Sequence, residues 1–150
     1  MNEAQITLQG WLGADPAYET KDGVSRCKFR VATTPRRYDK ESGTWVDGDT
    51  QWYSVIAWRG LADNCSASLK RADPVVVHGR IKAEVWSNRV GIEVTTFEVE
   101  AVMVGHDLTR GTSSFARTPG QGSPVDASPA QVAGPAPSLE GQEAGSRAAA

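Results

Sequence analysis

Short stretches in which apolar and polar residues alternate recur along the chain, and this period of two is typical of half-buried β-strands. In the first stretch, Gln5–Leu12, Ile6 and Leu8 alternate with polar residues. The second, residues 24–34, has an apolar face of Cys27, Phe29 and Val31 and a cationic face of Arg26, Lys28 and Arg30. Both stretches are therefore predicted to be strands with one face in the core.

Two later stretches place aromatic residues on one face of a strand. In residues 51–58, one face carries Trp52, Ser54, Ile56 and Trp58. In residues 74–86, an aliphatic face that ends in Val85 is expected to line the core, and the opposite face carries His78, Arg80, Lys82, Glu84 and Trp86. Gly79 inside this strand predicts a bend or bulge, which a closing barrel needs.

One helix is predicted between the third and fourth strands. Its apolar stripe is Leu61, Cys65 and Leu69 at helical spacing, and Asp73 with Pro74 is predicted to stop it. The last strand, residues 90–103, changes phase at Thr95 and Thr96, which predicts a bulge there. Five strands with a helix between the third and fourth are the connectivity of an OB fold, so an all-β, five-stranded OB barrel is expected.

The chain of 150 residues divides into two parts by composition. Residues 1–110 hold all five Trp and are expected to form the single OB domain. Residues 111–150 are dominated by Gly, Ala, Ser and Pro. Because they offer too little apolar side chain to offset the entropy of ordering the backbone, we expect a disordered tail.

Charge, cysteine usage and the polar start restrict the partners and the compartment. The formal net charge is −2, so binding to a polyanion requires the Lys and Arg to gather on one surface. Cys27 and Cys65 have no CxxC spacing and are expected to be buried thiols, with a disulfide or redox role as the alternative. The start MNEAQ resembles neither a secretion signal nor a membrane span, which predicts a cytoplasmic protein without membrane contact.

The strand faces that combine Trp with cations predict a binding surface. Trp86 shares its face with Arg80 and Lys82, and a large aromatic side chain on a cationic face is costly to leave wet unless something stacks on it. Every nucleobase has a π-face, so aromatic platforms beside a positive groove bind single strands with little sequence preference. We therefore interpret these faces as a nucleic-acid interface, with burial in the core or in an oligomer interface as the alternative.

The polar connection between the second and third strands strengthens this interpretation. Residues 35–49 are longer than a tight hairpin needs, and long loops of this kind are commonly functional. The connection carries Arg36, Arg37, Tyr38, Lys40 and Trp45. This is not the composition of a passive linker.

Catalysis is not expected from this sequence. Its two histidines, His78 and His106, lie at no motif spacing from a Ser, a Cys or a carboxylate. The sequence holds no Gly-rich phosphate loop and no cluster of metal-ligand residues. Neither a cofactor nor a metal is therefore expected.

About the first 105 residues resemble the bacterial single-stranded-DNA-binding proteins, in order and with few gaps. The resemblance is carried by the segments ITLQGWLGADPAYE, FRVATTPRRYDKESGTW, TQWYSVIAWRGLADNCSASLKRADPVVVHGRIKAEVW and IEVTTFEVEAV. The loop RRYDKESGTWVDGDT is similar to that of actinobacterial members. The resemblance implies sequence-independent binding and protection of single-stranded DNA in replication, recombination, repair, segregation or DNA uptake, in association with the nucleoid.

The family's functional residues can be carried over by position. Its stacking aromatics in the third and fourth strands match Trp52, Trp58 and Trp86, and its stacking position in the loop matches Arg37 or Tyr38. Its phosphate-contacting cations match Lys40 and Arg71. The strand pattern adds Arg26, Lys28, Arg30, Arg36, Arg80 and Lys82.

The resemblance also has implications for partners. It implies a homotetramer wrapped by a single strand, with mixed oligomers with a tailed paralogue as a second form of assembly. Housekeeping members end in an acidic tip with hydrophobic residues that recruits replication and repair enzymes, whereas this sequence ends GQEAGSRAAA, so a paralogue without tail-mediated recruitment is expected. Trp11 is a second departure, at a turn position where the family has a small polar residue. Extension of the DNA track and simple packing are both open for it.

Three alternatives to single-stranded DNA binding remain. A primosomal-type OB module, which works through protein contacts, would be expected to lack the three matched tryptophans. An oligosaccharide-binding OB domain would not need the cationic faces. RNA in place of DNA is open, because a stacking platform reads neither the sugar nor the base edges strongly.

Overall fold

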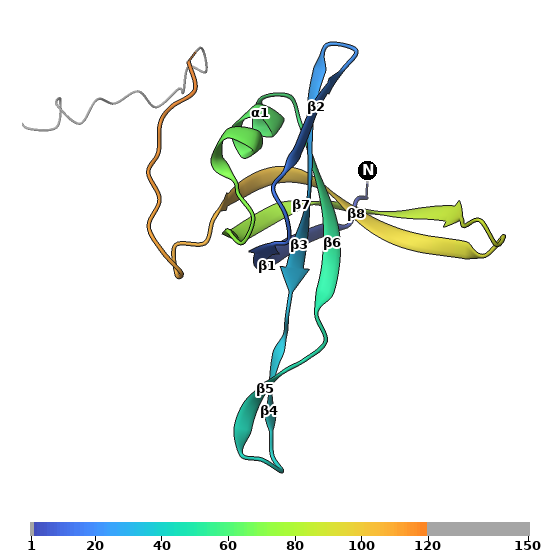
Figure 1. Cartoon of the computed structure of the whole chain (residues 1–150), viewed down its shortest axis with the longest axis vertical. Coiled ribbons are helices and arrows are strands. Elements are labelled where there is room, and N and C mark those ends of the chain that lie inside the picture. The colour runs from blue at the N-terminus through green and yellow to red at the C-terminus, as the bar shows by residue number, and fades with distance from the viewer. Residues whose placement is uncertain (1, 120–150) are drawn as a thin grey trace, which may run out of the picture. The chain divides into compact units, whose positions relative to one another are not determined.

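Five strands close into a barrel in the computed structural model, which describes residues 2–119 (Figure 1). The barrel strands are β1 (Gln5–Leu12), β3 (Val24–Thr33), β6 (Gln51–Trp58), β7 (Pro74–Ser87) and β8 (Glu93–His106). They are ordered β1-β7-β8-β6-β3, and a pairing of β1 with β3 closes the ring. Only β6 and β8 pair in parallel among these strands. The helix α1 (Arg59–Ser68) lies between the third and fourth barrel strands, so the predicted OB barrel is confirmed.

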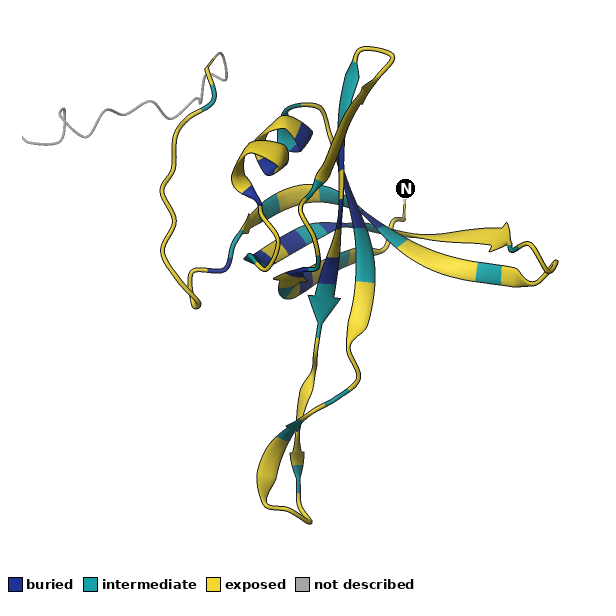
Figure 2. Cartoon of the chain, viewed as in Figure 1, coloured by how far each residue is buried: buried dark blue, intermediate teal, exposed yellow. Residues whose placement is uncertain are grey.

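The core is filled by the strand faces that the alternation predicted. In β3 the residues from Cys27 to Val31 are alternately buried and exposed. The helix contributes Ala62 and Cys65, so its predicted stripe does cover the barrel. Figure 2 shows the buried residues gathered where the barrel strands cross and on one side of α1. The core cluster consists of Leu8, Leu12, Cys27, Phe29, Val31, Val55, Ala57, Ala62, Cys65, Leu69, Val75, Val77 and Val99.

The helix ends at Ser68, earlier than the predicted stop at Asp73 and Pro74. Leu69 caps it in an extended conformation, with φ −98° and ψ 143°. A turn at residues 70–73 follows, in which the Lys70 N–H donates to the Asp73 carboxylate at 3.0 Å and the Asp73 N–H donates to the Lys70 carbonyl at 3.1 Å. Asp73 shapes this turn because its short side chain bonds the local backbone, which is how Asp favours turns.

Two hairpins extend the barrel, and neither was predicted. β2 (Ala17–Lys21) pairs with β3, and all its residues are exposed, so no alternation reveals it in the sequence. The segment that was predicted to be a long polar connection contains β4 (Arg36–Asp39) and β5 (Thr44–Asp47), which form a separate two-stranded sheet. Figure 1 shows this β4–β5 hairpin projecting away from the barrel.

The predicted irregularity at Gly79 is confirmed. The register of β7 against β8 shifts between His78, which faces Met103, and Gly79, which faces Ala101. Val102 is therefore the extra residue of a bulge in β8. A Cβ at position 79 would lie 2.2 Å from a backbone carbonyl oxygen of β8, so the two strands approach this closely only because the residue is glycine.

The bulge predicted at Thr95 and Thr96 is wrong, because β7 and β8 pair there without interruption. The core position predicted for Val85 is also wrong, since its side chain is 63 % exposed. Both residue sets lie in the part of the β7–β8 hairpin that extends beyond the barrel and is exposed on both faces (Figure 2). Hydrophobic phase carries no information about burial in such an arm.

The chain after β8 is held against the barrel at residues 107–113, which we call the strap. Its buried residue Asp107 donates its N–H to the Pro74 carbonyl at 3.0 Å. The Asp107 carboxylate accepts hydrogen bonds from Thr109 Oγ1 at 2.6 Å and from Gln9 Nε2 at 2.8 Å. These hydrogen bonds, those from Thr109 first, hold the pKa of Asp107 below its ordinary value.

Residues 2–113 belong to one compact unit, and residues 114–119 follow it without a helix or strand. The greater part of the predicted disordered tail, residues 120–150, lies outside the described residues. Within residues 2–119 no helix has the length and apolar character needed to cross a membrane.

Candidate nucleic-acid interface

The outward-pointing side chains of β3, β6, β8 and β7 form one continuous surface, which we call the outer face. Residues that are directly paired across neighbouring strands project to the same face. The register puts Arg30, Ser54, Glu98 and Lys82 in one row across the four strands. The next row is Lys28, Ile56, Glu100 and Arg80. The structure thus brings the strand cations of the sequence prediction onto a single surface.

Three tryptophans stand on this outer face with much of their indole exposed. Trp52 is 48 % exposed, Trp58 39 % and Trp86 49 %. Ile56 lies between the first two along β6 and is only 5 % exposed. Its row neighbours are long charged side chains, whose aliphatic stems can cover it. The indoles are therefore the aromatic surface that this face offers to a partner.

Arginines of β3 lie over two of these indole rings. The Arg30 guanidinium is 4.8 Å from the centre of the Trp52 ring, and the Arg26 guanidinium is 5.9 Å from that of Trp58. The Trp52 ring also lies against Gly13, where a Cβ would come within 2.5 Å of the ring. The missing side chain of Gly13 makes room for the ring, and the cation holds it from the other strand. The Trp52 ring is thus held between Arg30 and Gly13 while its side chain remains half exposed.

Acidic residues of β8 lie between the cations of β3 and β7, and sequence reasoning missed them. Glu98 pairs with Lys28 Nζ at 3.4 Å. Glu100 pairs with Lys82 Nζ at 2.7 Å and with the Arg80 guanidinium at 3.0 Å. The hydrogen bond from Lys82, together with the charges of Lys82 and Arg80, holds the pKa of Glu100 below its ordinary value. Three cations of the outer face are therefore already paired with carboxylates in the free protein.

The β4–β5 hairpin carries the residues that were predicted for the loop. Tyr38 and Trp45 are directly paired and meet edge to face, with ring centres 5.7 Å apart. Both rings are more than half exposed. Arg36 pairs with the Asp47 carboxylate at 3.1 Å. The other two cations of the prediction are also exposed on this hairpin: Arg37 and Lys40.

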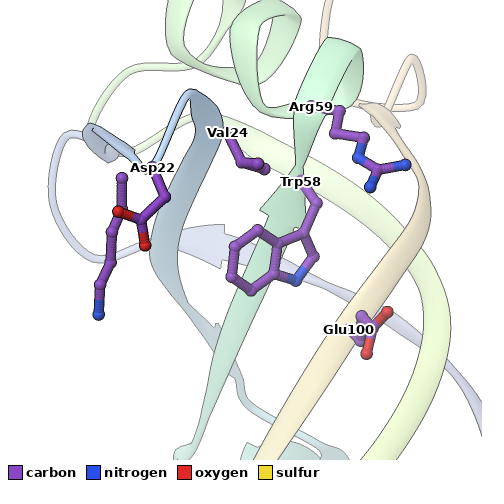
Figure 3. A pocket seen from close by; sticks show the side chains of 6 residues that line it. Asp22, Val24, Trp58, Arg59 and Glu100 are labelled. Carbon is purple, nitrogen blue, oxygen red and sulfur yellow. The ribbon is translucent and has the colours of Figure 1, made fainter.

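A shallow hollow lies beside Trp58 (Figure 3). Its indole stands in the hollow between Asp22 on one side and Glu100 on the other. Arg59 also lines the hollow and has φ 58°, in the left-handed region that is costly for a residue other than glycine. Arg59 is a cation that sequence reasoning missed, and its position directly after Trp58 was the only signal for it.

The end of β1 carries two more residues of interest. Arg71 lies in the turn at residues 70–73, and its N–H donates to the Asp15 carboxylate at 2.8 Å. Trp11 lies in β1, paired with Ala32 of β3, and not in the turn where the sequence placed it. Its side chain is 45 % exposed.

The cysteines and His106 each have a structural setting within residues 2–119. Cys27 and Cys65 are free and buried, as predicted, and burial raises the pKa of the Cys65 thiol to about 12. His106 bridges Asp73 at 3.2 Å and Ser113 at 2.9 Å, which the sequence spacing did not reveal, and these contacts help to hold the strap. Within residues 2–119 no three His, Cys, Asp or Glu side chains gather as metal ligands would.

A closed five-stranded barrel with a helix between its third and fourth strands is an OB fold, a class of domains that commonly bind oligonucleotides on their faces and loops. Residues 3–107 match the model of the Single-strand binding protein family, and the chain belongs to that family. The resemblance found in the sequence is thereby confirmed.

Among the relatives of this chain are single-stranded-DNA-binding proteins of Streptomyces and Mycobacterium species. The chain is 40 % identical to the Single-stranded DNA-binding protein 2 of Streptomyces avermitilis over 140 residues, which are 93 % of this chain and 87 % of the relative. It is 37 % identical to the Single-stranded DNA-binding protein of Mycobacterium tuberculosis over 134 residues, 87 % of this chain and 82 % of the relative. A solved structure, the small single-stranded DNA-binding protein from Streptomyces coelicolor, matches with a TM-score of 0.68 and 40 % identity, over 74 % of this chain and 100 % of that one.

Proposed function

We propose that this protein binds and protects single-stranded DNA without reading its sequence, and that it does so without covalent chemistry. Bases stack on Trp52, Trp58 and Trp86, and phosphates contact the cations of the outer face and of the β4–β5 hairpin. The observation that carries the proposal is the set of half-exposed indoles on one face, two of them held under arginines. The processes served are those in which single strands are exposed: replication, recombination, repair, segregation or DNA uptake, in the cytoplasm.

The energetics of the outer face favour a polyanion that also carries aromatic rings. Each base stacked on an aromatic side chain contributes about 1–3 kcal/mol. Each cation that neutralises a phosphate releases counterions, so the binding constant falls as salt rises. On a single strand, each such contact adds about −0.7 to the slope of log K against log salt. Because Glu98 and Glu100 already pair with Lys28, Arg80 and Lys82, phosphates must displace carboxylates there. Stacking therefore supplies most of the affinity at this centre, and the cations position the backbone.

A homotetramer is part of the proposal. Apolar side chains near the bulge of β8 are exposed in the single chain, with Val102 54 % and Met103 60 % exposed, and Val76 of β7 is 37 % exposed. Exposed apolar surface on a sheet is covered in many proteins by self-association. Mixed oligomers with a tailed paralogue would use the same surface. Sedimentation of the purified chain tests this, and a monomer at micromolar concentration would contradict it.

The binding proposal is tested by titrating intrinsic Trp fluorescence with poly-dT at several salt concentrations, with duplex DNA as competitor. We expect strong quenching that weakens with salt and resists the duplex. Binding of sugars without salt dependence would support the oligosaccharide alternative, and equal affinity for poly-U would extend the ligand to RNA. If the fluorescence does not change and the protein does not bind DNA, the alternative of a primosomal-type OB module that works through protein contacts would be favoured.

Matched variants on the β7–β8 arm sharpen the test. Trp86→Ala removes an indole from the outer face, and Phe97→Ala removes a ring that is 53 % exposed on the other face of the same arm. Loss of one stacked base predicts a decrease in affinity of about 5- to 150-fold for Trp86→Ala. Phe97→Ala should bind like the parent protein. Equal effects of the two variants would contradict stacking on the outer face.

A further inference from the structure

Trp11 lies in line with the aromatic platform at Trp52, on the other side of β3. Ala32 of β3 is paired with Trp11 of β1 and, on its other edge, with Trp52 of β6. Directly paired residues project to the same face, so both indoles rise from one row. Two strand spacings separate their Cα atoms, about 10 Å. The residue between them in this row is Ala32, whose side chain is a methyl group.

A cation accompanies Trp11 just as one accompanies Trp52. The Arg110 guanidinium of the strap lies 5.7 Å from the centre of the Trp11 ring. Arg71 lies in the turn beside the end of β1, where the Ala72 N–H donates to the Leu12 carbonyl at 2.9 Å. An exposed indole under an arginine, with a second arginine nearby, repeats the chemistry of the platforms on β6.

Trp11 is not needed to hold the strap. The strap is already attached by the Asp107 N–H to the Pro74 carbonyl at 3.0 Å and by Gln9 to the Asp107 carboxylate at 2.8 Å. The Trp11 side chain also remains 45 % exposed with the strap in place. A packing role would bury the ring, so nearly half of a large apolar surface remains unexplained.

We propose that Trp11 is a fourth base-stacking platform, which extends the single-strand track from Trp52 across β3 onto β1, with Arg110 as its phosphate-contacting partner. The occupant is a nucleobase of the same strand that Trp52 holds, so the inference rests on the proposed function. The nucleic acid crosses Ala32, the one small residue of the row. This end of the track then includes Arg71, which lies apart from the other predicted cations if the outer face alone binds the strand.

The test compares Trp11→Ala, Trp11→Phe and Tyr18→Ala in the full chain, by affinity for a short dT oligonucleotide. We expect Trp11→Ala to weaken binding by about 5- to 150-fold and Trp11→Phe to restore most of it. Tyr18→Ala is the matched control: Tyr18 is also 45 % exposed, but it is paired with Cys27 and thus projects to the opposite face. Circular dichroism checks that each variant is folded.

A cross-linking measurement gives a readout that a structural role would not move. Irradiation of the parent protein with a 5-iodouracil oligonucleotide should yield an adduct on the peptide that contains Trp11. Parent-like affinity of Trp11→Ala together with no adduct would overturn the inference, whether or not the variant melts at a lower temperature. Trp52→Ala distinguishes failure of the proposed function from failure of the further inference. If Trp52→Ala does not weaken binding, the proposed function fails. If Trp52→Ala weakens binding while Trp11→Ala does not and no adduct forms on the Trp11 peptide, only the fourth platform fails.

Discussion

Glu100→Gln should make binding to single-stranded DNA tighter and more sensitive to salt. In the free protein the Glu100 carboxylate holds Lys82 at 2.7 Å and Arg80 at 3.0 Å. A neutral amide of the same shape frees Lys82 from its carboxylate without leaving a cavity. It also removes one of the two carboxylates that pair with Arg80, the other being Glu3 at 3.4 Å. Phosphates can then contact Lys82 without first displacing a carboxylate, and Arg80 with one carboxylate fewer to displace.

The magnitude follows from the number of cations released. Each phosphate contact on a single strand contributes about 0.7 to the slope of log K against log salt, so two contacts steepen the slope by up to about 1.4. Between 50 and 200 mM salt, such a slope makes the affinity fall about 7-fold more than in the parent protein. Fluorescence titration with dT oligonucleotides at four or more salt concentrations between about those limits measures it.

Glu93→Gln is the control for this experiment. It removes the same charge from the same strand, but Glu93 is paired with Ser87 and projects to the opposite face from Glu100. We expect a small gain in affinity from the change in net charge and no change in slope. If Glu100→Gln left the slope unchanged, or if Glu93→Gln steepened it equally, Arg80 and Lys82 would not contact phosphates. The outer face would then not be the phosphate-binding surface at these residues.

Three further predictions concern stability and reactivity. Gly79→Ala should lower the free energy of unfolding by about 1–3 kcal/mol or more in urea denaturation, since its Cβ would lie 2.2 Å from the Glu100 carbonyl oxygen and only a backbone shift relieves that contact. The pKa of Asp107 is lowered in the folded protein, so its ionised carboxylate stabilises the fold above the ordinary Asp pKa, and this stabilisation is lost as the pH falls through the lowered value. Asp107→Asn should therefore reduce the decrease of Tm at acidic pH. An unchanged decrease of Tm would refute this prediction. Burial raises the pKa of the Cys65 thiol to about 12, so Ellman's reagent should react with it at pH 8 only after denaturation, and fast labelling of the native protein would contradict the burial.

The barrel and the orientation of its aromatic residues follow from local patterns in the sequence. A strand repeats every two residues, so the alternation in β3 and β6 suffices to place Phe29 inside and Trp52 outside. The irregularity at Gly79 could be predicted because a glycine inside an apolar strand indicates a bulge or a close approach of another backbone. The prediction succeeded in β3, where one strand face is buried and the other is exposed, since burial is what relates hydrophobic phase to geometry.

The same pattern failed where both faces meet water. Val85 looks like a core residue by phase, but its side chain is exposed in the arm beyond the barrel, and β2 shows no phase because all its residues are exposed. Thr95 and Thr96 were assigned a bulge that belongs to Val102, where β8 must bend around the barrel. Where neither face of a strand is buried, the alternation of apolar and polar residues does not predict which side chains lie in the core.

Only the tertiary structure decided which residues become neighbours across strands. The alternation shows that Glu98 and Glu100 share a face, but their place between the cations of β3 and β7 depends on a parallel pairing of β6 with β8. Trp11 joins the row of Trp52 only because β1 closes the barrel against β3. Register between strands far apart in the chain is set by the closure of the whole barrel, and no local stretch of sequence contains it.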